Sequence, residues 1–325
     1  MAPALAAGNH VIVKPSHQDP ESTVKLINLI HQHNIYSDDT VQVVVGDGAV
    51  GEAIIKDPRI KKISFTGSTM VGKRIAQLCS ESLKPCTLEL GGKNCAVVFA
   101  DASIDLAVDS IVDGAFSNMG QNCCGISRLL VHSDIYDEFM VCLKKKTSRL
   151  VIGDPSLPQT DIGPIVDSQA YQRITNAIKE ATKDENVTLW QLESASSDNE
   201  KDLIIPPTIL EKVPLESSIS STELFGPVLC IHEPFDTIDE AIESVNYIAN
   251  QTGYSLASGC FTTSHSTSDY FAQKVEAGMV WINGWNENDP GVPFGGFNQS
   301  GIGKELGIEG LYAFTRQKSI TRFKE

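Results

Sequence analysis

The sequence has 325 residues, of which 41% are hydrophobic and 21% charged. This composition is typical of a globular chain of about two domains and excludes overall disorder. The 41 acidic residues outnumber the 26 basic ones, which gives a net charge of −15. Because such a surface repels nucleic acid and anionic lipid, we expect no nucleic-acid partner and no membrane partner.

The sequence also argues against secretion and against membrane insertion. No stretch approaches the ~18 consecutive apolar residues of a membrane span, and residues 1–7 lack the basic and apolar regions of a secretory signal. The eight cysteines are scattered, without the density of a disulfide scaffold or the paired spacing of a zinc site. We therefore expect reduced thiols, a cytoplasmic location and no metal ion.

The first ninety residues alternate short β-branched segments with helical patterns. The predicted elements are a strand at 9–14, a helix from about Pro20, a strand at 41–45, a helix at 49–55, a strand at 60–66 and a helix from 67 to about 78. The first helix has an apolar face at helical spacing, formed by Val24, Leu26, Ile27, Leu29 and Ile30. Such alternation predicts a parallel sheet with helices on both faces, whose ligands bind at the carboxyl ends of the strands.

The alternation continues in the second part of the chain. Strands are predicted at residues 96–99 and 129–132, and helices at 104–116, 134–150 and 168–183. Residues 191–202 are polar and are predicted as an exposed loop. We place a boundary near Gly91-Gly92, between a nucleotide-type half and a second α/β domain.

Three strand-to-helix junctions are candidates for contact with a phosphate or a ribose. Gly46, Gly48 and Gly51 match G-x-G-x-x-G, which fits either a tight turn or a phosphate contact at a helix N-terminus; the acidic residue expected about 20 positions further on is absent. Gly67-Ser68 opens the next helix, where Ser68 either caps the helix or binds a pyrophosphate. Lys14, at the end of the first strand, either bonds to a ribose or lies in solvent.

Two further residues could carry chemistry. Glu89 lies between two leucines on an apolar strand, so it either pairs with a cation or has a raised proton affinity suited to a base. Cys123 follows 34 residues later on a glycine-rich segment. It would need nearby positive charge or helix dipoles to react as a thiolate, and otherwise it is an ordinary thiol.

Seven motifs together resemble the NAD(P)-dependent aldehyde dehydrogenase superfamily, in that family's order and over essentially the whole chain. They are residues 3–9 (PALAAGN), 65–68 (FTGS), 88–93 (LELGGK), 120–123 (GQNC), 223–228 (ELFGPV), 293–296 (PFGG) and 300–307 (SGIGKELG). The resemblance implies an α/β fold, with a partial Rossmann-like parallel-sheet dinucleotide domain at 1–91 and an α/β catalytic domain at 92–310. It also implies a C-terminal oligomerisation strand and tail at 311–325, with the strand at 317–323, in a homodimer or homotetramer.

The resemblance also implies roles for individual residues. Cys123 is the expected nucleophile and Glu89 the expected base. The nucleophile is assigned to Cys123 and not to Cys124 because the family's order is Gly-Gln-any-Cys, and Cys124 is expected only to pack. The expected cofactor is NAD, with NADP as an alternative. The residues expected beside it are Lys14 at the adenosine ribose, Gly67 and Ser68 at the pyrophosphate, Glu223 at the nicotinamide ribose, Phe225 at the nicotinamide ring, and Gly48 and Leu90. Asn283 resembles an asparagine that supports the active site.

The implied reaction is oxidation of an aldehyde to a carboxylic acid through a thiohemiacetal and a thioester on the cysteine. Two alternatives are a catalytically silent or structural homologue and a hydrolase that uses only the Cys123–Glu89 half of the cycle. The chain departs from the family at Met1, where the family's chain is already well advanced. We therefore expect it to lack the family's first strands, its bridging hairpin and its oxyanion asparagine.

Smaller departures concern single positions. His17 replaces the glutamate of Lys-Pro-x-Glu, and this loss removes both a hydroxyl acceptor and a repulsion against a 2′-phosphate. Lys304 replaces the more usual arginine, for which we expect little consequence. The stretch 285–291 is polar, acidic and expected to face the substrate.

Overall fold

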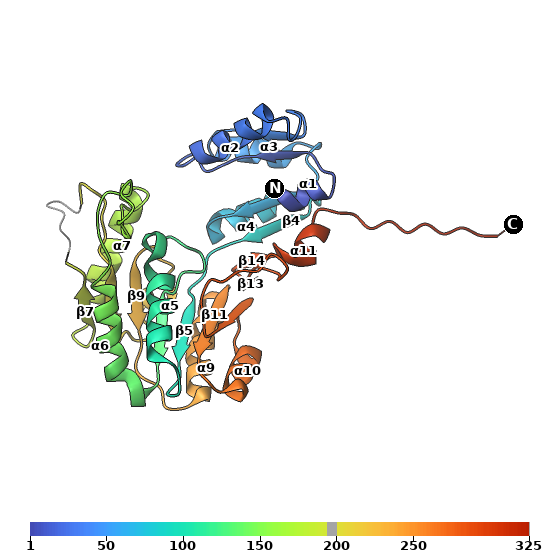
Figure 1. Cartoon of the computed structure of the whole chain (residues 1–325). Coiled ribbons are helices and arrows are strands. Elements are labelled where there is room, and N and C mark those ends of the chain that lie inside the picture. The colour runs from blue at the N-terminus through green and yellow to red at the C-terminus, as the bar shows by residue number, and fades with distance from the viewer. Residues whose placement is uncertain (194–199, 325) are drawn as a thin grey trace. The chain divides into compact units, whose positions relative to one another are not determined.

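The computed structural model describes residues 1–193 and 200–324 (Figure 1). Contacts divide the chain into two compact units, which are Met1–Glu89 with Asn288–Gly295 and Ile302–Glu325 (unit 1), and Leu90–Glu287 with Gly296–Gly301 (unit 2). Two stretches that we assigned to the catalytic domain, residues 288–295 and 302–310, thus pack within unit 1. The roles assigned to the predicted domains stay predictions.

In unit 1 the strands β1, β2 and β3 are each followed by a helix. Its elements are α1 (Ala2–Ala6), β1 (Val11–Val13), α2 (Glu21–Gln32), β2 (Val41–Val43), α3 (Gly48–Lys56), β3 (Ile63–Thr66), α4 (Thr69–Ser80), β4 (Cys86–Glu89) and α11 (Gly307–Tyr312). Within the described residues, β1 pairs with β2 and β3 with β4, both in parallel. The short strand β14 (Gly301–Ile302) lies on the other side of β4. These elements confirm the predicted alternation, with strands shorter than predicted.

Side chains at the helix starts explain where α3 and α4 begin. The Asp47 carboxylate accepts hydrogen bonds from the N–H groups of Ala49 and Val50. The Ser68 hydroxyl accepts one from Val71. Both side chains satisfy N–H groups that lack partners within the helix, so the capping role of Ser68 is confirmed.

Helix α2 is only half covered. Ile27 and Ile30 are buried, whereas Leu26 and Leu29 are 50% and 42% exposed. Nothing in the described part of the chain packs over these two leucines fully, although the periodicity predicted one apolar face. Exposed leucines on one helix form an apolar surface that favours association with another apolar surface.

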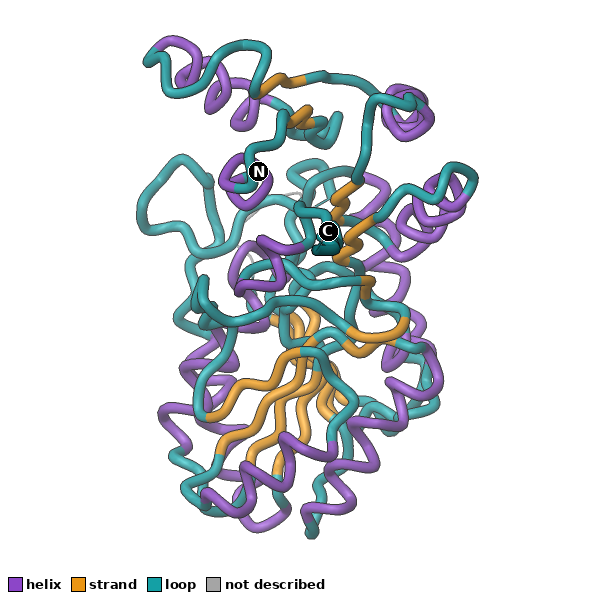
Figure 2. Tube along the Cα trace, turned by 90° about the vertical axis from the view of Figure 1, so that its right-hand side faces the viewer, coloured by secondary structure: helices purple, strands orange, loops and turns teal. Residues whose placement is uncertain are grey.

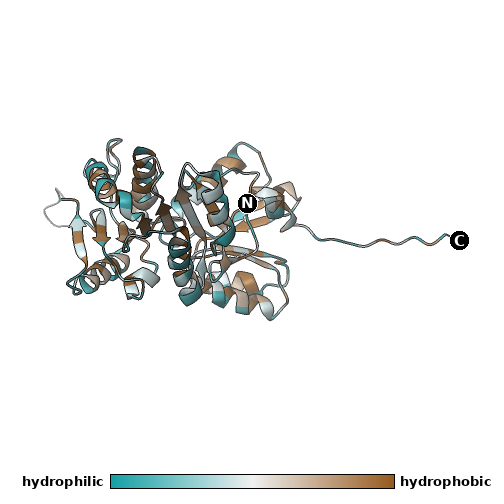
Figure 3. Ribbon diagram, turned by 90° about the horizontal axis from the view of Figure 1, so that it is seen from below, coloured by the Kyte–Doolittle hydropathy of each residue, from teal (hydrophilic) through white to brown (hydrophobic). Residues whose placement is uncertain are grey.

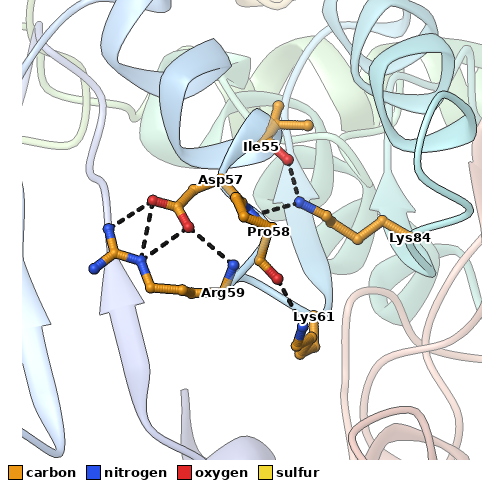
Figure 4. Close-up of polar contacts among 6 residues, drawn as sticks. All are labelled: Ile55, Asp57, Pro58, Arg59, Lys61 and Lys84. Atoms are coloured by element: carbon orange, nitrogen blue, oxygen red, sulfur yellow. Dashed lines mark hydrogen bonds and ion pairs between the residues drawn. The ribbon is translucent and has the colours of Figure 1, made fainter.

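The junction between α3 and β3 is held by charged side chains (Figure 4). Lys84, from the loop before β4, donates to the carbonyl oxygens of Ile55 and, at 2.8 Å, Asp57. The Arg59 guanidinium bonds to the Asp57 carboxylate and holds the pKa of Asp57 well below its usual range. A cation at the C-terminal end of α3 satisfies carbonyl groups and interacts favourably with the helix dipole.

We expect Lys84→Met to lower the free energy of unfolding by about 1–2 kcal/mol, because it leaves partly buried carbonyl groups without a donor. Lys61→Met is the matched control. Lys61 also donates to a carbonyl oxygen, that of Pro58, but it is exposed (Figure 4), so its loss should change stability by under about 0.5 kcal/mol. Urea unfolding of both variants measures the difference; equal effects would contradict the role of Lys84.

Unit 2 is built around a large sheet. Within the described residues seven strands are ordered β12-β11-β5-β6-β9-β8-β7, and only β7 runs antiparallel to its neighbour. The strands are β5 (Cys95–Val98), β6 (Arg128–Val131), β7 (Thr188–Gln191), β8 (Thr208–Glu211), β9 (Val228–Ile231), β11 (Ala257–Phe261) and β12 (Met279–Ile282), with a separate pair β10 (Tyr254–Ser255) and β13 (Phe297–Asn298). Figure 2 shows helices on both faces of this sheet.

The helices and turns of unit 2 complete its core. They are α5 (Ile104–Phe116), the turns η1 (Ser117–Gly120) and η2 (Ser133–Ile135), α6 (Tyr136–Thr147), α7 (Ser168–Ala181), α8 (Ser218–Ser221), α9 (Ile238–Thr252) and α10 (His265–Lys274). One cluster of buried side chains joins β5, β6 and β11 to α9 and α10, and another joins β8 and β9 to α7 and α8. Hydrophobic residues accordingly follow the central strands (Figure 3).

Several predictions of secondary structure can be compared with unit 2 and the tail. The two strands and three helices predicted between residues 96 and 183 are confirmed within a few residues at each end, except that η2 precedes α6. The polar stretch 191–202 falls partly outside the described residues. Residues 317–323 form no strand in this single chain, because a strand needs a neighbour to pair with; the oligomerisation strand stays a prediction.

No helix in the described ranges combines the length and apolar character that crossing a membrane requires. None of the eight cysteines, all of which lie in those ranges, forms a disulfide bond. The redox state of these thiols stays a prediction.

Candidate active site

Cys123 lies on a loop of residues 121–125, here called the cysteine loop, which a left-handed turn separates from α5. Asn118, Met119 and Gly120 have positive φ angles of 51°, 56° and 64°, a conformation that is costly for residues other than glycine. A Cβ at Gly120 would lie 2.3 Å from the carbonyl oxygen of Gly226. The turn is thus packed, backbone against backbone, on residues 223–227, which we call the ELFGP loop.

Asn94 fixes the backbone of the cysteine loop. Its side-chain amide donates to the carbonyl oxygens of Cys123 at 2.8 Å and Gly125 at 2.9 Å. Its side-chain oxygen accepts a hydrogen bond from the N–H of Ala257 at 3.1 Å. Asn94 is buried, so these bonds hold the loop where water cannot compete for them.

Trp285 supports the same loop from a distant part of the chain. Its indole N–H donates to the carbonyl oxygen of Cys124 at 2.8 Å, and its ring packs against Trp281. Trp285 is 6% exposed, whereas residues 286–291 are exposed, and the expectation that this stretch faces the substrate stays a prediction. The side chain of Asn283 bonds to the backbone of Thr262 through both its oxygen and its nitrogen, and so braces the end of β12.

The Cys123 thiol is the most acidic of the cysteines whose shifts are resolved. The Sγ atoms of Cys123 and Cys124 are 3.9 Å apart, and the hydrogen bond from the Cys124 side chain lowers the pKa of Cys123 to about 7, against the opposing effects of burial and of Glu223. Burial instead raises the pKa of Cys79 to about 11 and of Cys260 to about 12. Because the thiolate is the nucleophile, Cys123 is the cysteine suited to attack at neutral pH.

The segment Gly91-Gly92 contacts both the cysteine loop and Glu223. The N–H of Gly92 donates to Glu223 Oε1 at 3.1 Å, and a Cβ at Gly91 would lie 2.2 Å from Oε2. A Cβ at Gly92 would lie 3.1 Å from the carbonyl oxygen of Cys123. Burial raises the pKa of Glu223, although the N–H of Gly92 and the charge of Lys93 oppose this effect.

Phe225 is unusual for an aromatic residue in this unit. Its φ angle is 53°, and its side chain is 40% exposed. Arg173 holds the loop from behind by donating to the carbonyl oxygens of Glu223 and Leu224. A cavity of about 20 Å³ lies between the ELFGP loop and the cysteine loop, which is room for about one water molecule.

In unit 1 the predicted site residues follow the carboxyl ends of parallel strands. Lys14 follows β1, Gly48 follows β2, Gly67 and Ser68 follow β3, and Glu89 ends β4. Carbons of the Lys14 side chain lie 3.8 Å from the position of a Cβ at Gly51, and its ammonium donates to the carbonyl oxygen of Pro15. The structure therefore places the glycine motif and Lys14 together.

Glu89 is buried, with 4% of its surface exposed. Its backbone oxygen accepts a hydrogen bond from the N–H of Gly67 at 3.0 Å, which joins the ends of β3 and β4. A Cβ at Gly295 would lie 2.4 Å from Glu89 Oε1. The PFGG motif thus supplies the glycine that leaves room for the Glu89 carboxyl.

The predicted site residues fall into two groups. Leu90, Cys123, Glu223 and Phe225 belong to unit 2, where Gly91-Gly92 joins the cysteine to Glu223; the remaining residues, Glu89 among them, belong to unit 1. Sequence reasoning missed Asn94, since an asparagine beside a glycine pair has no distinctive spacing. Sequence reasoning also missed that the Cys124 side chain lowers the pKa of Cys123, because the motif indicates only which cysteine attacks.

The sequence matches the aldehyde dehydrogenase family over residues 1–320. Aldehyde dehydrogenase [NAD(P)+] 1 of Saccharomyces cerevisiae is 40% identical over 98% of this chain, which covers 63% of that protein. Human retinaldehyde dehydrogenase 3 is also 40% identical, over 99% of this chain and 61% of its own length. The crystal structure of Mycobacterium tuberculosis aldehyde dehydrogenase complexed with NAD+ is similar with a TM-score of 0.90 and 34% identity, over 98% of this chain and 64% of that one.

This chain therefore belongs to the aldehyde dehydrogenase family, as the motifs indicated, and its fold is that family's α/β fold. It spans somewhat less than two thirds of the length of these relatives.

Proposed function

We propose that this protein oxidises an aldehyde to a carboxylic acid, with NAD(P)+ as the acceptor and Cys123 as the nucleophile. The observation that carries the proposal is the Cys123 thiol, whose pKa is lowered to about 7 on a loop that Asn94 and Gly92 hold beside Glu223. The names of the relatives support the reaction class.

The residues present fit a dinucleotide. The start of α4, behind Gly67 and Ser68, offers backbone N–H groups to a pyrophosphate. Lys14 and the Glu223 carboxylate offer a donor and acceptors for ribose hydroxyls, and the exposed side chain of Phe225 offers an apolar surface to a ring. NAD(P)+, when bound, supplies the hydride acceptor. NAD is the favoured cofactor, and NADP remains the alternative because His17 in place of a glutamate removes a repulsion against a 2′-phosphate.

The residues of this chain act in two stages, formation of the thioester on Cys123 and its hydrolysis with Glu89 as the base. The Cys123 thiolate attacks the aldehyde carbonyl, and nearby N–H groups stabilise the oxyanion, an effect worth about 3–4 kcal/mol per donor in comparable sites. Loss of hydride from this adduct leaves a thioester on Cys123. Glu89 then takes a proton from water, which attacks the thioester and releases the acid.

The test is NADH formation from a panel of aldehydes. Cys123→Ser should lower the rate by about 10³-fold or more, because a hydroxyl without an adjacent base is a poor nucleophile. Cys142→Ser is the matched control, since Cys142 lies on α6 outside the described site. Equal turnover by wild type and Cys123→Ser would refute the role of Cys123.

A catalytically silent homologue is distinguished by cofactor binding. Saturating NAD+ at about 100 times its Kd should stabilise a working dehydrogenase by about 2.7 kcal/mol, which a thermal melt detects. A melting temperature that NAD+ does not change would favour the silent homologue. Ester hydrolysis without NAD+, together with no aldehyde oxidation, would favour a hydrolase.

A further inference from the structure

The carboxyl group of Glu89 lies against two residues from the other end of the chain, and all three belong to unit 1. A Cβ at Gly295 would lie 2.4 Å from Glu89 Oε1 and 3.2 Å from Cδ of Lys304. The Lys304 ammonium donates to the carbonyl oxygen of Gly295. Gly295 thus has the Glu89 carboxyl at its Cα and the Lys304 ammonium at its carbonyl oxygen.

The backbone holds Gly295 and Lys304 beside each other. Phe294 and Glu305 form an antiparallel bridge, with N–H···O distances of 2.7 and 2.8 Å in the two directions. Gly295 has a φ angle of 143°, a conformation that residues with a Cβ rarely adopt. Gly295 therefore lies between fixed positions of the Glu89 carboxyl and the Lys304 side chain.

The charges of Glu89 and Lys304 interact. Burial lowers the pKa of Lys304, and the charge of Glu89 acts in the opposite direction. The reciprocal effect must exist, because the interaction between two charges is shared. A carboxyl that is 4% exposed loses the hydration that favours its ionised form, and a cation nearby offsets that loss.

Two other charged side chains, Lys62 and Glu305, bond to residues of β4 and β3. Lys62 donates to Thr87 Oγ1 at 2.5 Å, and Glu305 accepts a hydrogen bond from Ser64 at 2.8 Å. Burial lowers the pKa of Lys62, and the charge of Glu305 is the first effect that opposes it. Of these two lysines, Lys304 is the one whose pKa the charge of Glu89 affects.

We propose that Lys304 is a positioning residue for the base Glu89: tethered to Gly295, its ammonium keeps the buried carboxylate ionised and orders it against the glycine. The assignment of Glu89 as the base rests on the proposed function; the electrostatic coupling does not. Because either lysine or arginine supplies this cation, the proposal agrees with the expectation that lysine in place of arginine at position 304 has little consequence.

The experiment follows the ionisation of Glu89 directly in the full-length chain. Protein labelled with 13C at the glutamate side-chain carboxyl carbon is titrated by NMR, and the Glu89 signal is identified by its absence in Glu89→Gln. In Lys304→Met, which removes the charge and keeps the stem, the titration midpoint of Glu89 should rise by about one pH unit. Lys304→Arg, which keeps a cation, should restore a midpoint near that of wild type.

Two further variants keep the test decisive. Lys62→Met removes another partly buried lysine of the same sheet and should leave the Glu89 midpoint unchanged. Lys304→Gln replaces Lys304→Met if the latter does not unfold cooperatively in urea. A midpoint that is the same in wild type and in folded Lys304→Met or Lys304→Gln would overturn the proposal.

The same variants separate this inference from the proposed function. In the dehydrogenase assay, the acidic limb of the pH–rate profile should move to a pH about one unit higher in Lys304→Met. At a pH below that limb, the rate should then be about tenfold lower than in wild type. Lys304→Arg should have a limb near that of wild type. A wild type that titrates as expected but oxidises no aldehyde would refute the proposed function and keep the coupling. A wild type that oxidises aldehydes, together with a Glu89 midpoint that does not change in Lys304→Met, would keep the proposed function and refute the coupling.

Discussion

Cys123 should be alkylated by iodoacetamide with a rate that rises through a midpoint near pH 7, whereas Cys79 and Cys260, whose pKa burial raises to about 11 and about 12, should react appreciably only at higher pH. The reason is the hydrogen bond from the Cys124 side chain, which lowers the pKa of Cys123 to about 7. A lowered thiol pKa means that the reactive thiolate is half populated at the midpoint and is lost as the pH falls below it. Peptide mass spectrometry after timed alkylation assigns the rate to each cysteine.

The decisive comparison replaces the neighbouring thiol. In Cys124→Ala the donor is gone, so the midpoint should move toward the ordinary value of ~8.5, and alkylation at pH 7 should slow by about tenfold. Cys124→Ser is the control, since its hydroxyl keeps a donor at the same position. If Cys124→Ala were alkylated with the wild-type midpoint, the Cys124 side chain would have no role in activating Cys123.

This neighbour effect shows where sequence reasoning reaches its limit. The motif GQNC identifies one cysteine, and the spacing alone predicts that Cys124 packs. Cys124 is indeed buried, but a hydrogen bond between adjacent side chains depends on their rotamers, which the pattern does not specify. Local signals were more reliable where a single side chain decides the outcome, as with Ser68 at the start of α4.

Gly120→Ala should lower the free energy of unfolding by about 3 kcal/mol or more. The left-handed conformation costs about 1–2 kcal/mol for a residue with a Cβ. The added carbon would also lie 2.3 Å from the backbone oxygen of Gly226, which neither loop can relieve by turning a side chain. Urea unfolding measures the loss, and the pH dependence of Cys123 alkylation reports whether the cysteine loop has moved.

Gly284→Ala is the matched control for this substitution. A Cβ there would meet only the flexible side chain of Glu287, at the ordinary distances of 3.5 Å to Oε1 and 3.8 Å to Cδ, so we expect a change within about 0.5 kcal/mol. A Gly120→Ala protein as stable as Gly284→Ala would mean that the two loops are not packed as described.

The fold was predictable where periodicity is strong and partners are near in sequence. The strand–helix alternation before Glu89 predicted β1, β2 and β3, but it did not predict β4 as a strand of its own. The helix predicted at 104–116 matches α5. Periodicity predicted no element beyond residue 202. The strands β8, β9 and β11 are short and buried, so their apolar runs have no period, whereas the helix α9 was missed despite its capping box. The exposed Leu26 and Leu29 show that an apolar pattern does not guarantee a covering surface.

The supports of the site were the least predictable part. Asn94, Gly295 and Lys304 act through contacts with residues far along the chain, and a single sequence carries no signal of such pairing. The motif residues could be identified because the family resemblance covers them one by one. How each is held depends on tertiary packing alone.

The contacts that brace Cys123 have a consequence for synthesis. Asn94 and Ala257 are 163 residues apart, Cys124 and Trp285 are 161 apart, and the bond between Gly91 and Ser300 joins residues 209 apart. A ribosome releases the GQNC segment long before it has made the indole that supports it. Since distant contacts form slowly and late, the nucleophile is made well before Ala257, Trp285 and Ser300 and acquires its final environment only after these residues have been made.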